Sequence, residues 1–234
     1  NQMNFEQRLK ELENADFFNS ELIAADLRFV HEIQNLIRPD RPIFLKAVGW
    51  HKNANPNSIF RSIRQRILRA KKRIEIVSPY IQFYPNDLRL IEKWLLKNPE
   101  AEFHVYTNSK QTTDHHILPA LFDAIYGPSL VQIKDNPKIG ERLKVFTFAI
   151  TPELKAKGFL HMKFIRIDGV EVLKSTSNLD ALSRIHNSEV GLWIRSSLYF
   201  SQMNSVITEL RSLCVEWGSE EWTKLNRPDE KSWK

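Results

Sequence analysis

The first part of the chain carries the apolar spacing of a helix over residues 4–37. Apolar side chains recur there at steps of three and four residues, which places them on one helix face; they are Leu22, Ile23, Leu27, Val30, Ile33, Leu36 and Ile37. Pro39 and Pro42 end this pattern, because proline lacks the N–H that a helix interior needs. We interpret residues 1–40 as a helical N-terminal arm or linker and residues 41–234 as the folded domain.

After residue 40, short β-branched runs alternate with helical spacings. The predicted strands lie at 43–48, 74–77, 103–107, 130–133, 144–150, 159–167, 170–173 and 189–194. The predicted helices lie at 59–73, 87–98, 114–126 and 198–217, the third closed by Gly127-Pro128. Asp168-Gly169, between two strands, is a hairpin signal. The alternation indicates an α/β fold, an α-β-α sandwich with a central mixed β-sheet.

The composition excludes several classes of protein but does not indicate a function. The 234 residues suit one large domain, and 34 Lys plus Arg against 28 Asp plus Glu give a net charge of +6. The single cysteine excludes an intramolecular disulfide and a cysteine-based zinc site. No apolar run approaches the ~20 residues of a membrane span, and no signal-peptide pattern opens the chain. The charge permits anionic partners but does not choose among them.

One basic cluster is denser than the rest of the chain. It falls in a segment where Ile59, Ile63 and Ile67 mark the buried face of a helix, so its cations belong to the other faces. The cluster consists of Arg61, Arg64, Arg66, Arg69, Lys71, Lys72 and Arg73. We interpret it as a solvated helix face in preference to a ligand site.

The candidate chemistry begins with His161 and Lys163, whose side chains share a face if both lie on a strand. Lysine can bind nonbridging phosphate oxygens, and histidine can attack phosphorus or move a proton. Ser175-Thr176-Ser177-Asn178 follows the return strand and offers neutral donors to a phosphoryl oxygen. Glu189 opens the next strand and could orient an imidazole. Together these residues suit phosphate chemistry.

This arrangement resembles the phospholipase D superfamily, whose HKD signature is His-x-Lys, four residues, then Asp. The chain has His161-Met162-Lys163, four residues and Asp168, and it continues with Ser175-Thr176-Ser177-Asn178 and Glu189. With Ser78-Pro79-Tyr80 and Thr107-Asn108-Ser109 upstream, these segments look like the cardiolipin-synthase branch. The resemblance covers roughly residues 55–217.

The resemblance implies catalytic roles for four residues. His161 would form a phosphohistidine or act as acid and base, and Lys163 and Asn178 would hold the phosphoryl oxygens. Glu189 would pair with a catalytic histidine. No metal or other cofactor is implied, because lysine and hydrogen-bond donors neutralise the phosphate.

Three further motif residues have supporting roles in the resemblance. Thr176 and Ser177 would bind substrate, Thr176 standing where the family usually has serine, and Asp168 is better explained as a turn former than as a catalytic group. Two positions depart from the family pattern, since Ser175 replaces the usual glycine and Leu182 the usual arginine. These departures affect turn geometry or substrate contacts and leave the catalytic set in place.

The family's active site uses two such motifs, and no other histidine here begins a His-x-Lys-x4-Asp sequence. The chain is then either the C-terminal half of a two-motif enzyme or a one-motif protein whose site forms across a two-fold dimer. We favour the first, because the chain starts with Asn1 and residues 43–80 resemble the opening of a second repeat. His161 would then be the second-motif histidine, which by resemblance is usually the acid and base.

The implied function is a phosphodiesterase or phosphatidyltransferase that acts on glycerophospholipids through a phosphohistidine, with this chain supplying one of two HKD motifs. Its partners would be a phospholipid substrate, a membrane surface, and a second HKD half or a homodimer subunit. Two alternatives stay open: a nuclease-type phosphodiesterase on the same fold, and an isolated half-domain that is inactive by itself. The localisation expected is bacterial-type cytoplasmic or membrane-peripheral, with a secreted effector as the other option.

Overall fold

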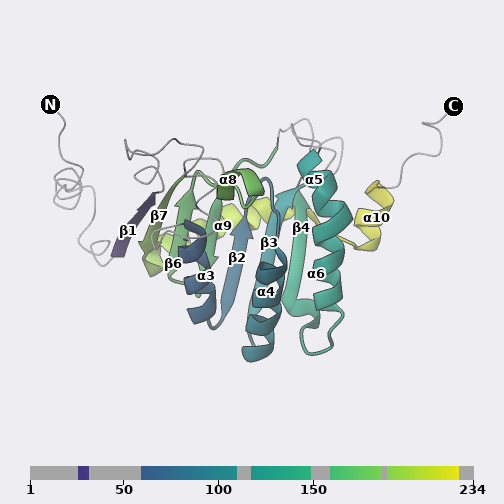
Figure 1. The fold of residues 1–234 in the computed structure, drawn as a ribbon, viewed down its shortest axis with the longest axis horizontal. Helices are drawn as coiled ribbons and strands as arrows, with labels where there is room; N and C mark the ends of the chain where they lie inside the picture. The colour runs from purple at the N-terminus through teal and green to yellow at the C-terminus, as the bar shows by residue number, and fades with distance from the viewer. Residues whose placement is uncertain (1–25, 32–58, 110–116, 149–158, 186–188, 227–234) are drawn as a thin grey trace.

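The computed structural model describes residues 26–31, 59–109, 117–148, 159–185 and 189–226, which form one eight-stranded sheet with helices on its faces (Figure 1). The sheet order is β1-β7-β6-β5-β2-β3-β4-β8. The strands are β1 (Asp26–His31), β2 (Arg73–Val77), β3 (Glu102–Asn108), β4 (Leu143–Phe148), β5 (Phe164–Ile167), β6 (Glu171–Ser175), β7 (Val190–Arg195) and β8 (Cys214–Glu216). β2, β3 and β4 pair in parallel, and the other neighbours pair antiparallel. The predicted mixed sheet is confirmed.

Helices cover both faces of this sheet (Figure 1). The face seen in front carries α3 (Ile59–Arg69), α4 (Pro85–Lys97), α5 (Ile117–Leu121), a π-helical turn (Phe122–Tyr126) and α6 (Gly127–Lys134). The opposite face carries α9 (Ser197–Ser212), and shorter elements are a 3-10 turn (Gly140–Arg142), α8 (Ala181–Ile185) and α10 (Glu220–Asn226). No helix in these ranges has the length and apolar character needed to cross a bilayer.

Two apolar cores lie on opposite faces of the sheet, because successive strand residues point to opposite sides. The core beneath α3, α4 and α6 includes Ile63, Ile74, Ile91, Phe103 and Leu130. The core beneath α9 includes Val77, Tyr106, Phe146, Met203 and Ile207. The four-residue spacing of the α3 isoleucines therefore predicted its buried face correctly.

Residues 26–31 differ from the helix predicted over 4–37. They form β1, which pairs antiparallel with β7 along its whole length. The edge of β7 supplies hydrogen-bond partners from far along the chain, and such pairing overrides a local helical spacing. The rest of that predicted helix and the predicted strand 43–48 lie outside the described residues. β1 belongs to the sheet, whereas the domain boundary at residue 40 stays a prediction.

The predicted strand 130–133 is also wrong, because these residues belong to α6. Gly127-Pro128 was expected to close a helix but occupies the first turn of one, with Gly127 at φ −57° and ψ −55°. Proline is tolerated in a first turn, where its missing N–H needs no partner within the helix. The chain therefore stays helical from α5 through the π-helical turn into α6.

Two further boundaries differ from the prediction. The helix predicted over 198–217 ends at Ser212, and the chain then adds β8 to the free edge of β4. The strand predicted over 159–167 begins only at Phe164. The other predicted elements in the described ranges are confirmed, with ends that shift by a few residues.

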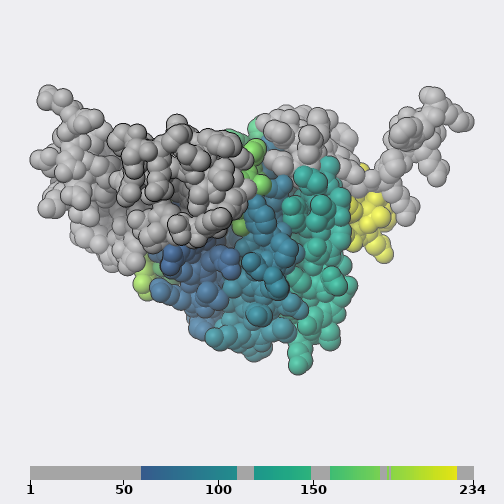
Figure 2. All heavy atoms as spheres, viewed as in Figure 1, coloured from purple at the N-terminus to yellow at the C-terminus, as the bar shows by residue number. Residues whose placement is uncertain are grey.

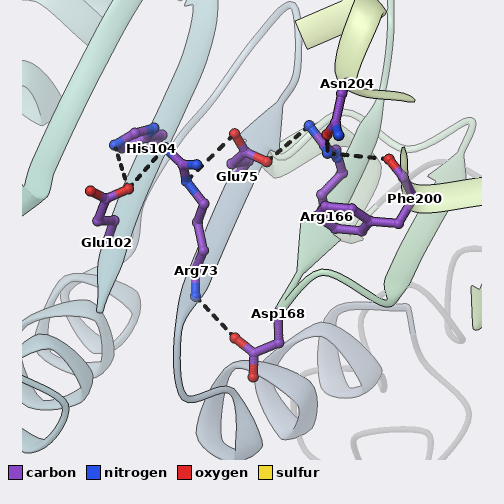
Figure 3. A network of polar contacts seen from close by, with 8 residues as sticks. All are labelled: Arg73, Glu75, Glu102, His104, Arg166, Asp168, Phe200 and Asn204. Atoms are coloured by element: carbon purple, nitrogen blue, oxygen red, sulfur yellow. Dashed lines mark hydrogen bonds and ion pairs between the residues drawn. The ribbon is translucent and has the colours of Figure 1, made fainter. Parts of the chain in front are cut away.

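A chain of polar side chains crosses the sheet on the face that α9 covers (Figure 3). Arg166 forms an ion pair with Glu75 (3.0 Å), and both side chains are almost fully buried. Arg73 contacts Glu75 (3.8 Å) and Glu102 (2.8 Å). Glu102 also lies 3.8 Å from Nε2 of the buried His104. The face of the sheet beneath α9 thus carries a row of charged side chains at positions that apolar side chains could also fill.

His104 should make this fold sensitive to mild acid. Burial, with Arg73, Arg211 and Lys144 nearby, lowers its pKa from 6.5 to about 3. The unfolded chain therefore binds a proton that the folded chain resists, and stability falls as pH drops below 6.5. Between neutral pH and pH ~5 we expect a loss of roughly 2 kcal/mol in the free energy of unfolding.

Denaturant unfolding of the wild type and of His104→Gln at both pH values measures this term. The exposed histidines contribute the same pH dependence of stability to both proteins, so their contribution cancels when the two proteins are compared. The variant should lack the loss assigned to His104, and an equal pH dependence in the two proteins would contradict the assignment.

Candidate active site

Three chain segments that carry the motif residues meet at one end of the central strands. β5 begins at Phe164, which lies opposite the last residue of β2 and next to the end of β6. Ser175 ends β6, faces the start of β7 and donates its N–H to the carbonyl of Lys163 (3.1 Å). The residues just before β5, just after β6 and just before β7 therefore share one edge of the sheet.

His161 and Lys163 precede β5 rather than lying on it, so strand alternation is not what brings them together. Instead, the Lys163 ammonium donates to the carbonyl of His161 (2.9 Å). The imidazole lies edge-on to the ring of Phe159, with centroids 5.7 Å apart. His161 is exposed and Lys163 is half-buried, so a ligand in solvent can reach both.

A buried asparagine, Asn108, fixes the segment that carries His161. Its side-chain oxygen accepts the N–H of Leu160 (2.9 Å), and its amide donates to the carbonyls of Leu160 (2.9 Å) and Pro79 (3.3 Å). Asn108 ends β3 and is 1% exposed. This clamp ties the residue before His161 to the rigid centre of the sheet. No role was predicted for Asn108 from the sequence. Its place in Thr107-Asn108-Ser109, at the end of a predicted strand, was the signal that could have indicated one.

If His161 is the reacting group that the motif resemblance implies, replacing Asn108 with alanine should lower the kcat of that reaction about 10²-fold while KM changes little, because a misplaced reacting group costs rate at constant binding. Leu160 loses both backbone partners, and His161 is no longer held in place. Steady-state kinetics, corrected for the folded fraction from an unfolding curve, measures the effect. A loss that vanishes after this correction would show that Asn108 serves stability alone.

Glu189 is a buried carboxylate at the same edge, 5% exposed, just before β7. The Thr176 hydroxyl donates to its Oε2 (2.5 Å). In this contact Thr176 orients the Glu189 carboxylate. The predicted contact of Thr176 with substrate and the predicted pairing of Glu189 with a histidine both stay predictions.

The turn after β6 is held by serine side chains. Ser177 donates its N–H to Oγ of Ser175 and its hydroxyl to the carbonyl of Asn178, both at 2.8 Å. Ser177 is 4% exposed, so its hydroxyl stabilises the turn, and its predicted contact with substrate stays untested. Oδ1 of Asn178 is buried with no hydrogen-bond partner in the described ranges. Buried polar atoms are usually paired, so Asn178 has a hydrogen bond left to make.

Asp168, the third residue of the HKD motif, lies at the opposite end of β5. Its carboxylate accepts the N–H groups of Lys71 (2.7 Å), Lys72 (2.8 Å) and Arg73 (3.0 Å). The hairpin turn predicted at Asp168-Gly169 is confirmed, and both residues have positive φ, 52° and 81°. These contacts give Asp168 a structural role, joining the hairpin to the start of β2, as Figure 3 shows for Arg73.

Among the described residues, the segments at this edge carry the ammonium of Lys163, the imidazole of His161 and the buried carboxylate of Glu189. Lys163, Ser175 and Ser177 line a small pocket there, and Lys163 supplies its only formal positive charge among the described lining residues. Within the described ranges, no group of three or more His, Cys, Asp or Glu side chains is arranged to hold a metal ion. Lysine can neutralise a nonbridging phosphate oxygen, and the imidazole can attack phosphorus or transfer a proton.

Solved structures with this fold include a phosphatidylserine synthase and two shorter proteins, Nuc and NucT. Phosphatidylserine synthase of Haemophilus influenzae matches with a TM-score of 0.61 and 17% identity over 80% of this chain and 49% of its own. A phospholipase D family member, Nuc, from Salmonella typhimurium matches with a TM-score of 0.52 and 13% identity over 83% of this chain and 99% of its own. NucT from Helicobacter pylori matches with a TM-score of 0.52 and 13% identity over 82% of this chain and 98% of its own.

The chain thus spans about half the length of the synthase and nearly all of the two shorter proteins. No protein-family model and no curated protein sequence matches it. At these identities the structural likeness shows the fold alone, and the chain has the fold of these proteins, among them a phospholipase D family member.

Proposed function

We propose that this protein is a phosphodiesterase or phosphatidyltransferase that acts on glycerophospholipids, and that the chain supplies one of two HKD motifs. The observation that carries the proposal is that the segments with His161, Lys163, Asn178 and Glu189 meet at one sheet edge of a phospholipase D-like fold. Each group matches a need of phosphoryl transfer: charge neutralisation, nucleophilic or proton-transfer chemistry, and a carboxylate to orient an imidazole.

The reaction proceeds in two displacements at phosphorus. A histidine nitrogen of one motif attacks the phosphodiester, a P–N bond forms, and the P–O bond to the leaving alcohol breaks as the other histidine gives that oxygen a proton. The second histidine then takes a proton from water or an acceptor alcohol, which attacks phosphorus and breaks the P–N bond. We assign the proton-transfer role to His161 and the binding of nonbridging oxygens to Lys163 and Asn178.

The second motif comes from another HKD half. The match to about half of the synthase supports a second half in the same protein, which is the arrangement we propose. The match to nearly all of the Nuc and NucT chains supports the other arrangement, in which two copies of one chain build the site. Sedimentation velocity of the chain separates them, since a monomer requires a second half elsewhere.

Head-group release from phospholipid vesicles, run beside cleavage of DNA, tests the proposed function. The intact protein should release head groups or form a new phosphatidyl ester, and it should lose both activities when Lys163 is replaced with glutamine. Cleavage of DNA without turnover of any phospholipid would assign the site to nuclease-type chemistry instead.

A further inference from the structure

The positive charge of the chain is concentrated in one segment. Residues 59–97, which comprise α3, β2 and α4, hold ten Lys and Arg against three Asp and Glu, a net charge of +7. The rest of the chain holds 24 Lys and Arg against 25 Asp and Glu, a net charge of −1. The net charge of the whole chain therefore comes from this segment, whose two helices lie side by side on one face of the sheet (Figure 1, Figure 2).

Most of these cations are exposed and have no carboxylate beside them. Six belong to α3 and α4, and none of the six forms an ion pair with a described residue. We call these six the basic face, and they are Arg61, Arg64, Arg69, Arg89, Lys93 and Lys97. Two of the three carboxylates of the segment are buried and already paired, Glu75 with Arg166 (3.0 Å) and Asp87 with Arg184 (2.8 Å). The third, Glu92, is half-buried on α4.

The cations of the two helices meet across a shallow surface cleft. Arg64 of α3 and Arg89 and Lys93 of α4 line this cleft, and its described lining contains no carboxylate. Like charges that are held close together repel, and a solvated protein surface usually mixes both signs of charge. An extended anionic partner would relieve this repulsion along both helices at once.

Two exposed leucines lie among these cations and indicate which kind of anionic partner fits. Leu68 of α3 is 60% exposed and Leu96 of α4 is 41% exposed. Each precedes a cation of the basic face in the last turn of its helix, Arg69 or Lys97. Helices that lie on a membrane bury such apolar side chains at the acyl boundary while their Lys and Arg contact anionic head groups. A nucleic acid would leave the leucines in water, and neither helix has an exposed aromatic side chain on which a base could stack.

We propose that the basic face docks on an anionic phospholipid bilayer, with its cations against the head groups and Leu68 and Leu96 in the interfacial layer. The face adjoins the candidate active site, because Ile59 and Ile63 of α3 line the same small pocket as Lys163. A bilayer docked on α3 and α4 would therefore border that edge of the sheet. The proposal does not rest on the proposed function, since docking uses none of the candidate catalytic groups.

Flotation with vesicles of equal parts phosphatidylcholine and phosphatidylglycerol tests the docking, with His161→Ala in every protein so that turnover cannot alter the vesicles. Binding should be at least about tenfold tighter than to phosphatidylcholine alone and should weaken as salt is added. Arg64→Gln/Lys93→Gln should weaken it about fivefold per cation, roughly 25-fold in all. The matched control is Lys138→Gln/Lys224→Gln, which removes two exposed cations outside α3 and α4 and should change the affinity less than about twofold.

Leu68→Ser and a short DNA duplex separate a membrane from a nucleic acid as the partner. Leu68→Ser should weaken binding to the anionic vesicles about tenfold, because the leucine no longer leaves water. Equal binding to both kinds of vesicle, or equal effects of the two double variants, would overturn the proposal. Tighter binding of the duplex than of the anionic vesicles, or vesicle binding that Leu68→Ser leaves unchanged, would also overturn it. Head-group turnover by the protein with His161 intact reports on the proposed function separately.

Discussion

Turnover of phospholipid is expected to fall roughly 10²–10⁴-fold when His161 is replaced with alanine, the range that a positioned acid or base contributes. The imidazole is exposed at the sheet edge beside Lys163, so its removal leaves the packed core unchanged. The free energy of unfolding should therefore stay within about 0.5 kcal/mol of the wild type. The effect should appear in kcat, because Lys163 and Asn178 still bind the phosphate.

Met162→Ala is the matched control for this experiment. Met162 lies between the two motif residues and is 39% exposed, so its loss disturbs the same segment without removing a reacting group. Its turnover should stay within a few-fold of the wild type. An equal loss in both variants would mean that the segment matters for its shape and that His161 has no chemical role.

Replacing Arg166 with methionine is expected to cost about 3–5 kcal/mol of stability, the largest effect we expect outside the candidate active site. Arg166 is 2% exposed and forms the 3.0 Å ion pair with Glu75. It also donates to the carbonyl of Phe200 (3.3 Å) and to Asn204, and its guanidinium lies 4.0 Å from the centroid of the Phe200 ring. Figure 3 shows these contacts reaching from the sheet to α9.

The cost arises mainly because Glu75 is left as a buried charge. Burial already raises the pKa of Glu75, and Arg166 is the strongest of the charges that oppose this rise. The double variant Glu75→Leu/Arg166→Met removes both charges, so it should be more stable than Arg166→Met alone. Urea unfolding of the two variants measures the difference. If the double variant were the less stable of the two, packing of the arginine rather than its charge would hold α9 in place.

Local sequence patterns correctly predicted the elements that are stabilised by burying an apolar face of their own. The isoleucines of α3 and the β-branched run of β2 each show the period of the element they form. β1 and β8 were missed because each is made by pairing with a free edge, β7 or β4, distant in sequence. Gly127-Pro128 was misread because the same dipeptide can end one helix or begin another, and only the surrounding packing decides between them.

The motif spacing located the candidate site better than it described its geometry. It predicted that the segments of His161, Asn178 and Glu189 belong together, and the strand register brings their backbones to one edge. It placed His161 and Lys163 on a strand that begins only after them. It also gave no role to Asn108, whose partner Leu160 is 52 residues further along the chain. Contacts at that separation leave no local pattern to read.

The most direct test of the two-displacement mechanism is the fate of the phosphatidyl group when a primary alcohol competes with water. If a phosphohistidine forms, the intact protein should convert part of its phospholipid to the phosphatidyl alcohol as butanol is added, while the rate of head-group release stays constant. Both products should disappear together in His161→Ala. Head-group release that yields only phosphatidate at every butanol concentration, or release that survives in His161→Ala, would contradict a covalent intermediate served by this site.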